Sequence, residues 1–242
     1  MFKFLKNIMN NEDVNLTNDA YSLHRILKTE IKKYPSVEED EIIFGCGCFW
    51  GAEKCFWKLP GVVTTSVGYA GGEKNNPTYY EVCSGLTGHS EVVRVIWDKR
   101  EIDVSDLLKM FWECHDPTQK NRQGNDMGTQ YRSAIYYKNE NNIKTILASK
   151  EQYQTELSKK NLGLIETEIK MIDSYFYAEQ YHQQYLASAG SRQYCSASPT
   201  KVKLGVFTGS NYKLEDHIWE NFNWEVDKCV LRSDNNPIKN NI

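Results

Sequence analysis

The sequence predicts an α+β protein in which a mixed sheet packs against helices as a two-layer α/β sandwich. Strand-like and helical segments alternate between residues 41 and 137, a spacing that is typical of βαβ units. Apolar and polar side chains alternate over residues 165–171, which indicates a strand with one covered face. We therefore expect helices on one side of the sheet, a ferredoxin-like core and an irregular C-terminal tail.

The expected elements follow one another with clear boundaries. The strands are expected at residues 41–44, 62–69, 90–98, 130–137 and 165–171, and the helices at residues 49–59, 103–114, 140–159 and 181–186. Helix 103–114 carries apolar residues at helical spacing. Asp103 or Ser105 can cap its start, and Pro117 follows its end, so its limits are well defined.

Composition restricts the class of protein. Of the 242 residues, 40% are hydrophobic and 25% charged, as in a soluble globular protein with a core of ordinary size. The formal net charge of −3 argues against nucleic-acid binding, which needs a basic patch. No apolar run approaches the roughly 18 residues of a membrane span, and residues 1–10 lack the apolar core of a signal peptide. The seven cysteines are not spaced as a disulfide framework, so we expect a reducing, cytoplasmic environment.

Changes in composition divide the chain into three parts. Residues 1–40 are polar and mixed in charge, and we expect an N-terminal extension that packs on the domain or is partly mobile. Residues 41–190 hold the alternating strands and helices of the main domain. Residues 191–242 are rich in Ser, Asn and Lys with short apolar islands, so a loosely ordered tail is expected.

Cys48 is placed for reactivity, in the run GCFWG between a predicted strand and a predicted helix. The backbone N–H groups at a helix start favour a thiolate, so the pKa of Cys48 is expected to be depressed, or at least to fall when substrate binds. Flanking glycines leave the sulfur approachable, and Phe49 and Trp50 would give it an apolar pocket. The alternative is a buried structural cysteine, the usual fate of a single Cys in a core.

Three other groups could supply a proton to a substrate near this thiol. Glu91 lies on the same strand face as Val93, so burial should raise its carboxyl pKa and keep it protonated near pH 7. Tyr79 and Tyr131 are phenols in polar turns. Taken alone, Glu91 could equally reach solvent at the strand end, and the two tyrosines could be hydrogen-bonded turn residues.

Seven motifs in order resemble the peptide methionine sulfoxide reductase A family. They are GCFWG at 47–51, VGYAGG at 67–72, NPTY at 76–79, GHSE at 88–91, DPTQ at 116–119, GNDMGTQYRS at 124–133 and YHQQY at 181–185. The match covers about three-fifths of the chain, from residue 42 to residue 186. Because one short motif carries little weight, the resemblance rests on their number and order.

The resemblance implies roles for the candidate catalytic residues. Cys48 would be the nucleophile that attacks the sulfoxide sulfur and becomes a sulfenic acid. Glu91, Tyr79 and Tyr131 would hydrogen-bond the sulfoxide oxygen, and Glu91 would supply the proton. A sulfoxide sulfur is electrophilic only when its oxygen is polarised or protonated, so these roles agree with the residue types.

The resemblance also implies how substrate is held and which partners are needed. Phe49 and Trp50 would hold the S-methyl group, and Asp126 would help to fix the substrate through a hydrogen-bond network. The substrates would be oxidised proteins or free methionine sulfoxide, in the S configuration. Thioredoxin would be the reductant, and no cofactor or metal is expected. A monomer without membrane or nucleic-acid partners is expected.

A sulfenic acid must be resolved by a second thiol, and the tail offers Cys195 and Cys229. Many members of the family carry recycling cysteines in a short glycine-rich tail, whereas this tail is longer, Lys-rich and poor in glycine. This departure makes Cys195 the expected first resolving cysteine and Cys229 a candidate second. An apolar contact in the tail is the alternative for Cys229.

Two other classes of protein are possible from the residues alone. A Cys/His hydrolase or acyl transferase would pair Cys48 with a histidine, namely His89, His115 or His182, although His182 is more simply a residue that orients a turn. A zinc-stabilised interaction module would draw its ligands from Cys46, Cys48, His89 or His115, but Cys-x-Cys is not the usual ligand spacing. Cys55, Cys83 and Cys114 are expected to be core residues, and Cys46 to pack at a strand end.

Overall fold

A mixed sheet forms the centre of the protein in the structure, a computed structural model that describes residues 22–226 and 229–240 except the side chain of Cys229. Its strands are β1 (Glu39–Cys46), β2 (Val62–Ala70), β3 (Ser90–Asp98), β6 (Ser133–Tyr137), β7 (Glu168–Met171) and β8 (Tyr175–Tyr177). They lie in the order β7-β6-β1-β3-β2-β8. Only β6 and β7 pair in parallel, and the other neighbours are antiparallel. The predicted α+β class with a mixed sheet is thus confirmed.

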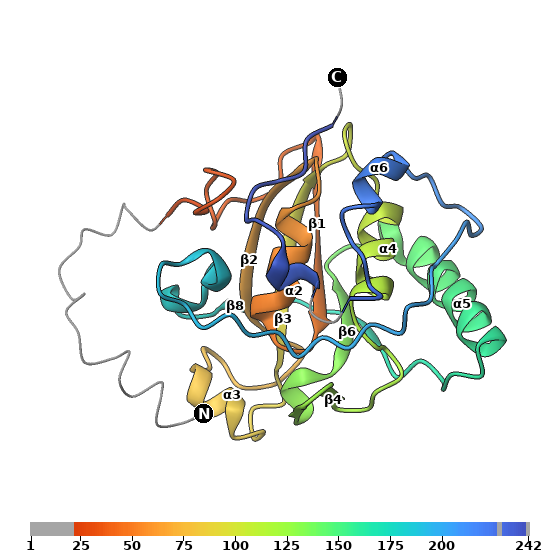
Figure 1. The fold of residues 1–242 in the computed structure, drawn as a ribbon. Coiled ribbons are helices and arrows are strands. Elements are labelled where there is room, and N and C mark those ends of the chain that lie inside the picture. The colour runs from red at the N-terminus through yellow and green to blue at the C-terminus, as the bar shows by residue number, and fades with distance from the viewer. Residues whose placement is uncertain (1–21, 227–228, 241–242) are drawn as a thin grey trace.

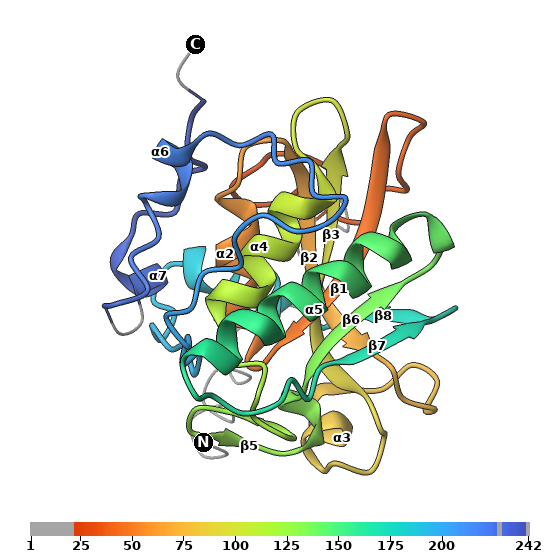
Figure 2. The ribbon, with the colours of Figure 1, turned by 90° about the vertical axis from the view of Figure 1, so that its right-hand side faces the viewer.

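Helices cover one face of this sheet (Figure 1). They and the remaining elements are α2 (Phe49–Trp57), α3 (Tyr79–Cys83), α4 (Val104–Cys114), α5 (Ile143–Lys159), α6 (Asp216–Trp219), α7 (Cys229–Arg232) and a hairpin of β4 (Arg122–Gln123) and β5 (Asp126–Met127). The helices α2 and α4 pack on the sheet, and α5 packs beside α4 (Figure 2). As predicted, Asp103 caps α4 by accepting the N–H of Ser105 at 2.9 Å. None of the described helices is long and apolar enough to cross a membrane.

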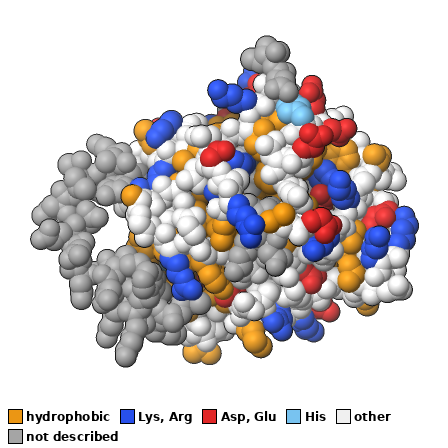
Figure 3. Space-filling view, in the orientation of Figure 1, with side chains coloured by type: hydrophobic (Ala, Val, Ile, Leu, Met, Phe, Trp, Pro, Cys, Tyr) orange, Lys and Arg blue, Asp and Glu red, His pale blue; other side chains and the backbone are white. Residues whose placement is uncertain are grey.

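Strand β3 shows how the sheet divides the core. Val93 and Val95 face the large cluster beneath the helices, whereas Val92 joins a smaller cluster on the opposite face. Side chains alternate along a strand, so Glu91 shares the face of Val93 and points to the helical layer. Basic and acidic side chains are interspersed over the described part of the molecular face in Figure 3, in keeping with the net charge of −3.

Several predicted elements differ from the structure at their ends or in kind. The helix expected at residues 140–159 begins only at Ile143, because residues 140–142 form a 3₁₀ turn. The strand expected at residues 130–137 begins only at Ser133, because a 3₁₀ turn (Thr129–Tyr131) precedes it. The strand expected at 165–171 begins at Glu168. The helix expected at 181–186 is replaced by two 3₁₀ turns, Gln180–His182 and Tyr185–Ala187. Gln184 between them has φ of +46°, which a right-handed helix cannot accommodate.

The tail is packed rather than loosely ordered. Val202, Leu204 and Phe207 belong to the main core, and the segment runs across α4 and α5 (Figure 2). The N–H of Leu204 donates to Glu113 of α4 at 3.0 Å, and the hydroxyls of Tyr153 in α5 and Thr200 lie 2.7 Å apart. These contacts correct the expectation of a loose tail.

The described part of the N-terminal extension also packs on the domain. His24 contacts Thr65 of β2, with 2.8 Å between Nε2 and Oγ1, and Thr29 donates to the carbonyl of Val63 at 2.6 Å. Residues 1–21 lie outside the described part of the chain.

Candidate active site

Cys48 lies where β1 ends and α2 begins, as its sequence context predicts. Gly47 makes the turn possible with φ of +85°, and a Cβ there would lie 2.5 Å from the side chain of Gln123. Cys48 caps α2 with its backbone, and 8% of its surface is exposed. The chain therefore turns sharply at Gly47 and leaves the thiol at the edge of a pocket.

The pocket gathers candidate residues from five separate elements and encloses about 510 Å³ of space that is continuous with solvent. Its lining includes seven of the residues proposed from the sequence, which are Cys48, Phe49, Trp50, Tyr79, Glu91, Asp126 and Tyr131. Three further residues, Tyr185, Arg192 and Tyr194, also line it. Two of these three could have been found from the sequence, since Tyr185 ends the YHQQY motif and Tyr194 precedes Cys195.

Glu91 is a buried carboxyl beside the start of α2. Its side chain is 2% exposed, and its Oε2 accepts the N–H of Phe49 at 3.2 Å. Burial raises the pKa of Glu91 to about 8, and the negative charge of Asp126 acts in the same direction. The carboxyl is therefore mostly protonated at pH 7 and can donate a hydrogen bond or a proton to a group in the pocket.

The thiol of Cys48 is neutral in this structure, contrary to the expected depression of its pKa. Burial raises the Cys48 pKa well above its usual value, and the charges of Glu91 and Asp126 raise it further. The N–H of Trp50 favours the thiolate, as a helix start should, but this effect is smaller. Because Glu91 is mostly protonated at pH 7, burial is the main obstacle to the thiolate under those conditions.

Tyr79 and Tyr131 present phenols to the same pocket. Tyr79 begins α3, where its N–H donates to Glu179 at 2.8 Å, and Tyr131 ends the 3₁₀ turn before β6. Both side chains are buried, and burial raises the pKa of each phenol above its usual range. Both tyrosines therefore remain hydrogen-bond donors over the whole physiological pH range.

Trp50 forms an apolar wall with residues of the two 3₁₀ turns. Its ring stacks on Tyr185 with 3.9 Å between centroids, and its Nε1 donates to His182 Nδ1 at 3.1 Å. The His182 ring also lies 5.1 Å from Phe49 and 4.5 Å from Tyr79. Burial lowers the pKa of His182 to about 3, so this neutral ring orients the aromatic side chains around it.

The tail crosses the pocket and contributes to it. The hydroxyl of Tyr194 donates to Asp126 Oδ1 at 2.6 Å, and the Arg192 guanidinium lies 5.2 Å from the Tyr194 ring. Gln123, in the same hairpin as Asp126, accepts the N–H of Ser198 at 3.1 Å. Hydrogen bonds on both sides of Cys195 therefore fix the tail against the β4–β5 hairpin.

Cys195 lies beside the helix that begins at Cys48. It is 3% exposed and packs so closely on Gly51 that a Cβ at Gly51 would overlap its Sγ. Its proximity also contributes to the raised pKa of Cys48. Cys229 begins α7, which packs against α2, but its side chain lies outside the described part of the structure.

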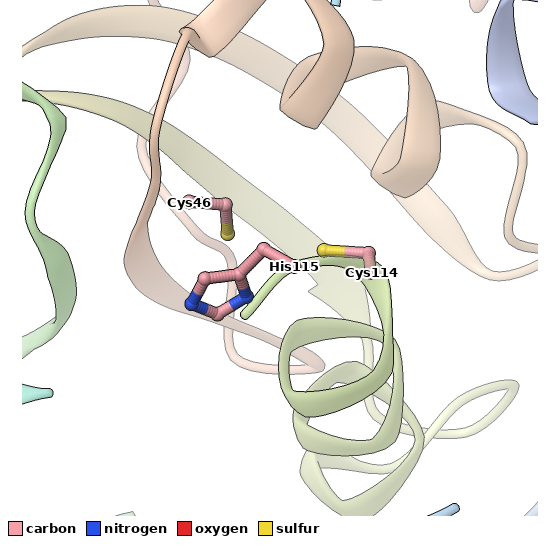
Figure 4. Close-up of side chains that lie close together, drawn as sticks. All are labelled: Cys46, Cys114 and His115. Atoms are coloured by element: carbon pink, nitrogen blue, oxygen red, sulfur yellow. The ribbon is translucent and has the colours of Figure 1, made fainter. Parts of the chain in front are cut away.

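Cys46, Cys114 and His115 form a compact buried group (Figure 4). His115 Nδ1 lies 2.7 Å from the carbonyl of Phe111, and its Nε2 lies 2.8 Å from Ser133 Oγ. Both ring nitrogens thus have protein partners, and burial lowers the pKa of His115 to about 4. Because a metal would have to displace one of these partners, the group fits a packed core better than a zinc site.

The remaining histidine and cysteine candidates are also part of the packing. His89 accepts the N–H of Gly72 at 3.1 Å through Nδ1, and its Nε2 contacts the carbonyl of Lys74 at 2.7 Å. Cys55 is buried and Cys83 half-buried. No disulfide joins any of the cysteines whose side chains are described.

A thiol enzyme that reduces an oxygen-bearing, electrophilic substrate suits this pocket better than a hydrolase. A Cys/His hydrolase needs a histidine base that contacts the thiol. Here the groups around Cys48 are a protonated carboxyl and two phenols, which donate to a substrate oxygen. A second thiol beside the first adds the means to form a disulfide, so the class is a thiol-dependent oxidoreductase.

Comparisons with known proteins agree with this class. Residues 40–212 match the model of the peptide methionine sulfoxide reductase family. MsrA of Vibrio vulnificus is 53% identical over 180 residues, covering 74% of this chain and 86% of the relative. MsrA of Azotobacter vinelandii is 57% identical over 68% of this chain and 76% of the relative. The chain belongs to the peptide methionine sulfoxide reductase family and is an oxidoreductase.

Solved structures show the same fold. Methionine sulfoxide reductase A of Corynebacterium diphtheriae superposes with a TM-score of 0.64 at 42% identity, covering 76% of this chain and 88% of that one. The reduced form of Mxr1 from Saccharomyces cerevisiae gives a TM-score of 0.62 at 35% identity, and the superposition covers 68% of this chain and 92% of that one.

Proposed function

We propose that this protein reduces methionine S-sulfoxide, free or in oxidised proteins, to methionine and thereby repairs oxidative damage. Membership of the family supports the reaction. The observation that carries the assignment of residues is that the Cys48 thiol and the protonated Glu91 carboxyl line one pocket. Such a pair can attack a sulfoxide sulfur while the sulfoxide oxygen is protonated.

In the first step, the sulfoxide oxygen accepts hydrogen bonds from Glu91, Tyr79 and Tyr131. Cys48 Sγ attacks the polarised sulfur and forms an S–S bond, while Glu91 gives its proton to the oxygen and the thiol proton replaces the one that Glu91 has lost. The S–O bond and the new S–S bond then break as the hydroxyl passes to Cys48 Sγ, which leaves a sulfenic acid on Cys48 and reduced methionine. The thiol sulfur loses two electrons and the sulfoxide sulfur gains them, so atoms and charge balance.

The apolar wall orients this attack. We propose that Phe49 and Trp50 hold the S-methyl group, because Trp50 is braced by stacking on Tyr185. Asp126 would fix the substrate through its hydrogen bond with Tyr194. An oriented methyl group leaves the sulfur facing the thiol, which is the geometry that an attack requires.

In the second step, Cys195 resolves the sulfenic acid. Its sulfur attacks Cys48 Sγ as the S–O bond breaks, and the proton of the Cys195 thiol passes to the departing hydroxyl, so that a Cys48–Cys195 disulfide forms and water leaves. The packing of Cys195 on Gly51 supports this assignment. Thioredoxin would then reduce the disulfide, either directly or after Cys229 has exchanged with it. Because Cys195 is buried, either route requires residues around it to move away.

We propose further that residues 41–190 form the catalytic domain and that the protein acts as a cytoplasmic monomer. The cysteine spacing in the sequence, which is not that of a disulfide framework, supports a reducing compartment. We also propose that β6, β1, β3 and β2 form a ferredoxin-like core. Their antiparallel order, with α2 and α4 as crossover helices, supports this label.

Turnover of separate S and R epimers of a peptide methionine sulfoxide, with dithiothreitol as reductant, tests the proposed function. Wild type should reduce only the S epimer, and Cys48→Ser should reduce neither. Glu151→Gln, on the exposed face of α5, serves as a control that should retain activity. Failure of wild type to reduce the S epimer, or equal activity of Cys48→Ser, would overturn the assignment.

A further inference from the structure

Glu53 is a fully buried carboxyl group in α2 that the proposed chemistry does not use, with 0% of its surface exposed. It accepts two hydrogen bonds from Gln184, one from the backbone N–H at 2.8 Å and one from Nε2 at 2.7 Å. Thr65 Oγ1 donates a third at 2.9 Å. Burial raises the pKa of Glu53 to about 7, and the hydrogen bonds from Gln184 and Thr65 oppose that effect. A fully buried carboxyl group with three donors is a built arrangement.

The direction of each hydrogen bond in this network is fixed. Because Thr65 donates its hydroxyl proton to Glu53, it must accept from His24 Nε2, which lies 2.8 Å away. His24 Nδ1 accepts the N–H groups of Ile26 and Leu27 at 3.2 and 3.0 Å, which requires the proton to be on Nε2. The N-terminal segment thus completes the network around Glu53.

The network acts on a strained part of the chain. Gln184 has the left-handed φ of +46°, a conformation that a residue with a side chain adopts only when its surroundings enforce it. Glu53 provides that constraint by binding both the backbone and the side chain of Gln184. Gln184 Oε1 also accepts the N–H of Arg25 at 3.3 Å.

The constraint is transmitted to the wall of the active site by a short path. Tyr185 follows Gln184 directly and stacks on Trp50, whose Nε1 donates to His182. Trp50 and Glu53 lie one helical turn apart in α2, so the same rigid helix contacts both ends of this segment. The distance between Trp50 and the anchor at Gln184 is therefore set by the helix.

We propose that Glu53 is a positioning residue of the active site. By holding Gln184 in its left-handed conformation, Glu53 keeps Tyr185 stacked on Trp50, so that the apolar wall for the S-methyl group is formed before substrate binds. This inference rests on the proposed function. His24, through Thr65, makes residues 22–29 a structural part of the same site.

Single-turnover reduction of a peptide methionine S-sulfoxide tests the inference, with rates measured over a range of substrate concentrations. In Glu53→Gln an amide N–H₂ group replaces one carboxyl oxygen of Glu53. It then faces a hydrogen-bond donor of Gln184, so that hydrogen bond is lost. We expect the half-saturating substrate concentration to rise about tenfold, while the maximal rate changes by less than about twofold. A loss of binding energy that is equal in the ground state and the transition state raises the half-saturating concentration but leaves the maximal rate unchanged. Glu113→Gln, at a buried glutamate of α4 that accepts the N–H of Leu204, is the matched control.

The double variant Glu53→Gln/Gln184→Glu restores the side-chain pairing between positions 53 and 184 with the groups exchanged, but it leaves the Thr65 hydroxyl facing an N–H₂ group. It should therefore return the half-saturating concentration part of the way toward wild type. If Glu53→Gln does not fold, Gln184→Gly gives the same test, since glycine adopts the left-handed conformation but lacks the side-chain hydrogen bond. An unchanged half-saturating concentration in a folded variant, or the same change in Glu113→Gln, would overturn the inference. An inactive wild type would instead overturn the proposed function.

Discussion

Cys195 Sγ lies directly against Gly51, so closely that even a methyl group at Gly51 would overlap the sulfur. Gly51 belongs to the first turn of α2, the helix that begins immediately after Cys48. The absence of a side chain at this one position therefore lets the second thiol dock beside the first. We conclude that the start of α2 leaves room for the sulfur atoms of both Cys48 and Cys195.

Replacing Gly51 by Ala should separate the two chemical steps. The added methyl group forces Cys195 away, so formation of the disulfide should slow on the order of tenfold, because disulfide formation requires close approach of both sulfurs. Formation of the first equivalent of methionine should be nearly unchanged. Rapid quench with mass spectrometry measures both rates. Gly163→Ala, where a Cβ would meet Thr118 at an ordinary 3.5 Å, is the control, and an equal effect there would contradict the account.

Replacing Glu91 by Gln should slow the first step. The amide keeps the shape and hydrogen bonding of the carboxyl but cannot transfer its proton, and loss of one general acid lowers a rate by about 10²–10⁴-fold. Single-turnover formation of methionine measures this loss. Glu151→Gln, on the exposed face of α5, should have no effect. A Glu91→Gln variant as fast as Glu151→Gln would show that the proton comes from elsewhere.

The first step should also depend on pH through Glu91. Its pKa of about 8 means that the proton is present below pH 8 and is lost as the pH rises through that value. The rate of methionine formation should therefore fall between roughly pH 7 and pH 9 in wild type. Glu91→Gln should lack this fall. A wild-type rate that rises steadily over the same range would indicate that ionisation of the thiol, rather than the acid, limits the reaction.

Replacing the tail cysteines should stop recycling without stopping the first turnover. Cys195→Ser should yield about one methionine per enzyme and then stall with thioredoxin, because the sulfenic acid has no internal partner. Dithiothreitol should restore part of the turnover. Cys229→Ser should slow the thioredoxin reaction and accumulate a Cys48–Cys195 disulfide if Cys229 is the relay. Full thioredoxin-dependent turnover without both cysteines would exclude the tail from recycling.

Periodicity and short motifs predicted much of the fold and most of the pocket. The alternation of residues along β3 placed Glu91 on the buried face with Val93, because side-chain direction in a strand is a local property. The limits of α4 were predicted from Asp103 and Pro117, because helix capping and the effect of proline are also local properties. Motifs that lie far apart in the sequence predicted most of the residues that line the pocket. No local pattern predicted the distances between these residues.

Properties that depend on tertiary packing were predicted poorly. The helix start suggested a depressed Cys48 pKa, but burial opposes it, and burial cannot be read from the flanking residues. The low apolar content of the tail predicts a loose segment, yet Val202 and Leu204 belong to the main core, and the N–H of Leu204 donates to Glu113 of α4. No sequence pattern singled out Glu53, because its partners Gln184 and Thr65 lie far away in the sequence.

The central claim is that Cys48 becomes a sulfenic acid as the sulfoxide is reduced. Cys195→Ser, treated with methionine S-sulfoxide in the absence of reductant and then digested, measures this directly by mass spectrometry. We predict one methionine per enzyme and a mass gain of one oxygen atom on the peptide that contains Cys48, in a form that a sulfenic acid reagent traps. Formation of methionine with Cys48 unmodified, or oxygen uptake at another cysteine, would contradict the account.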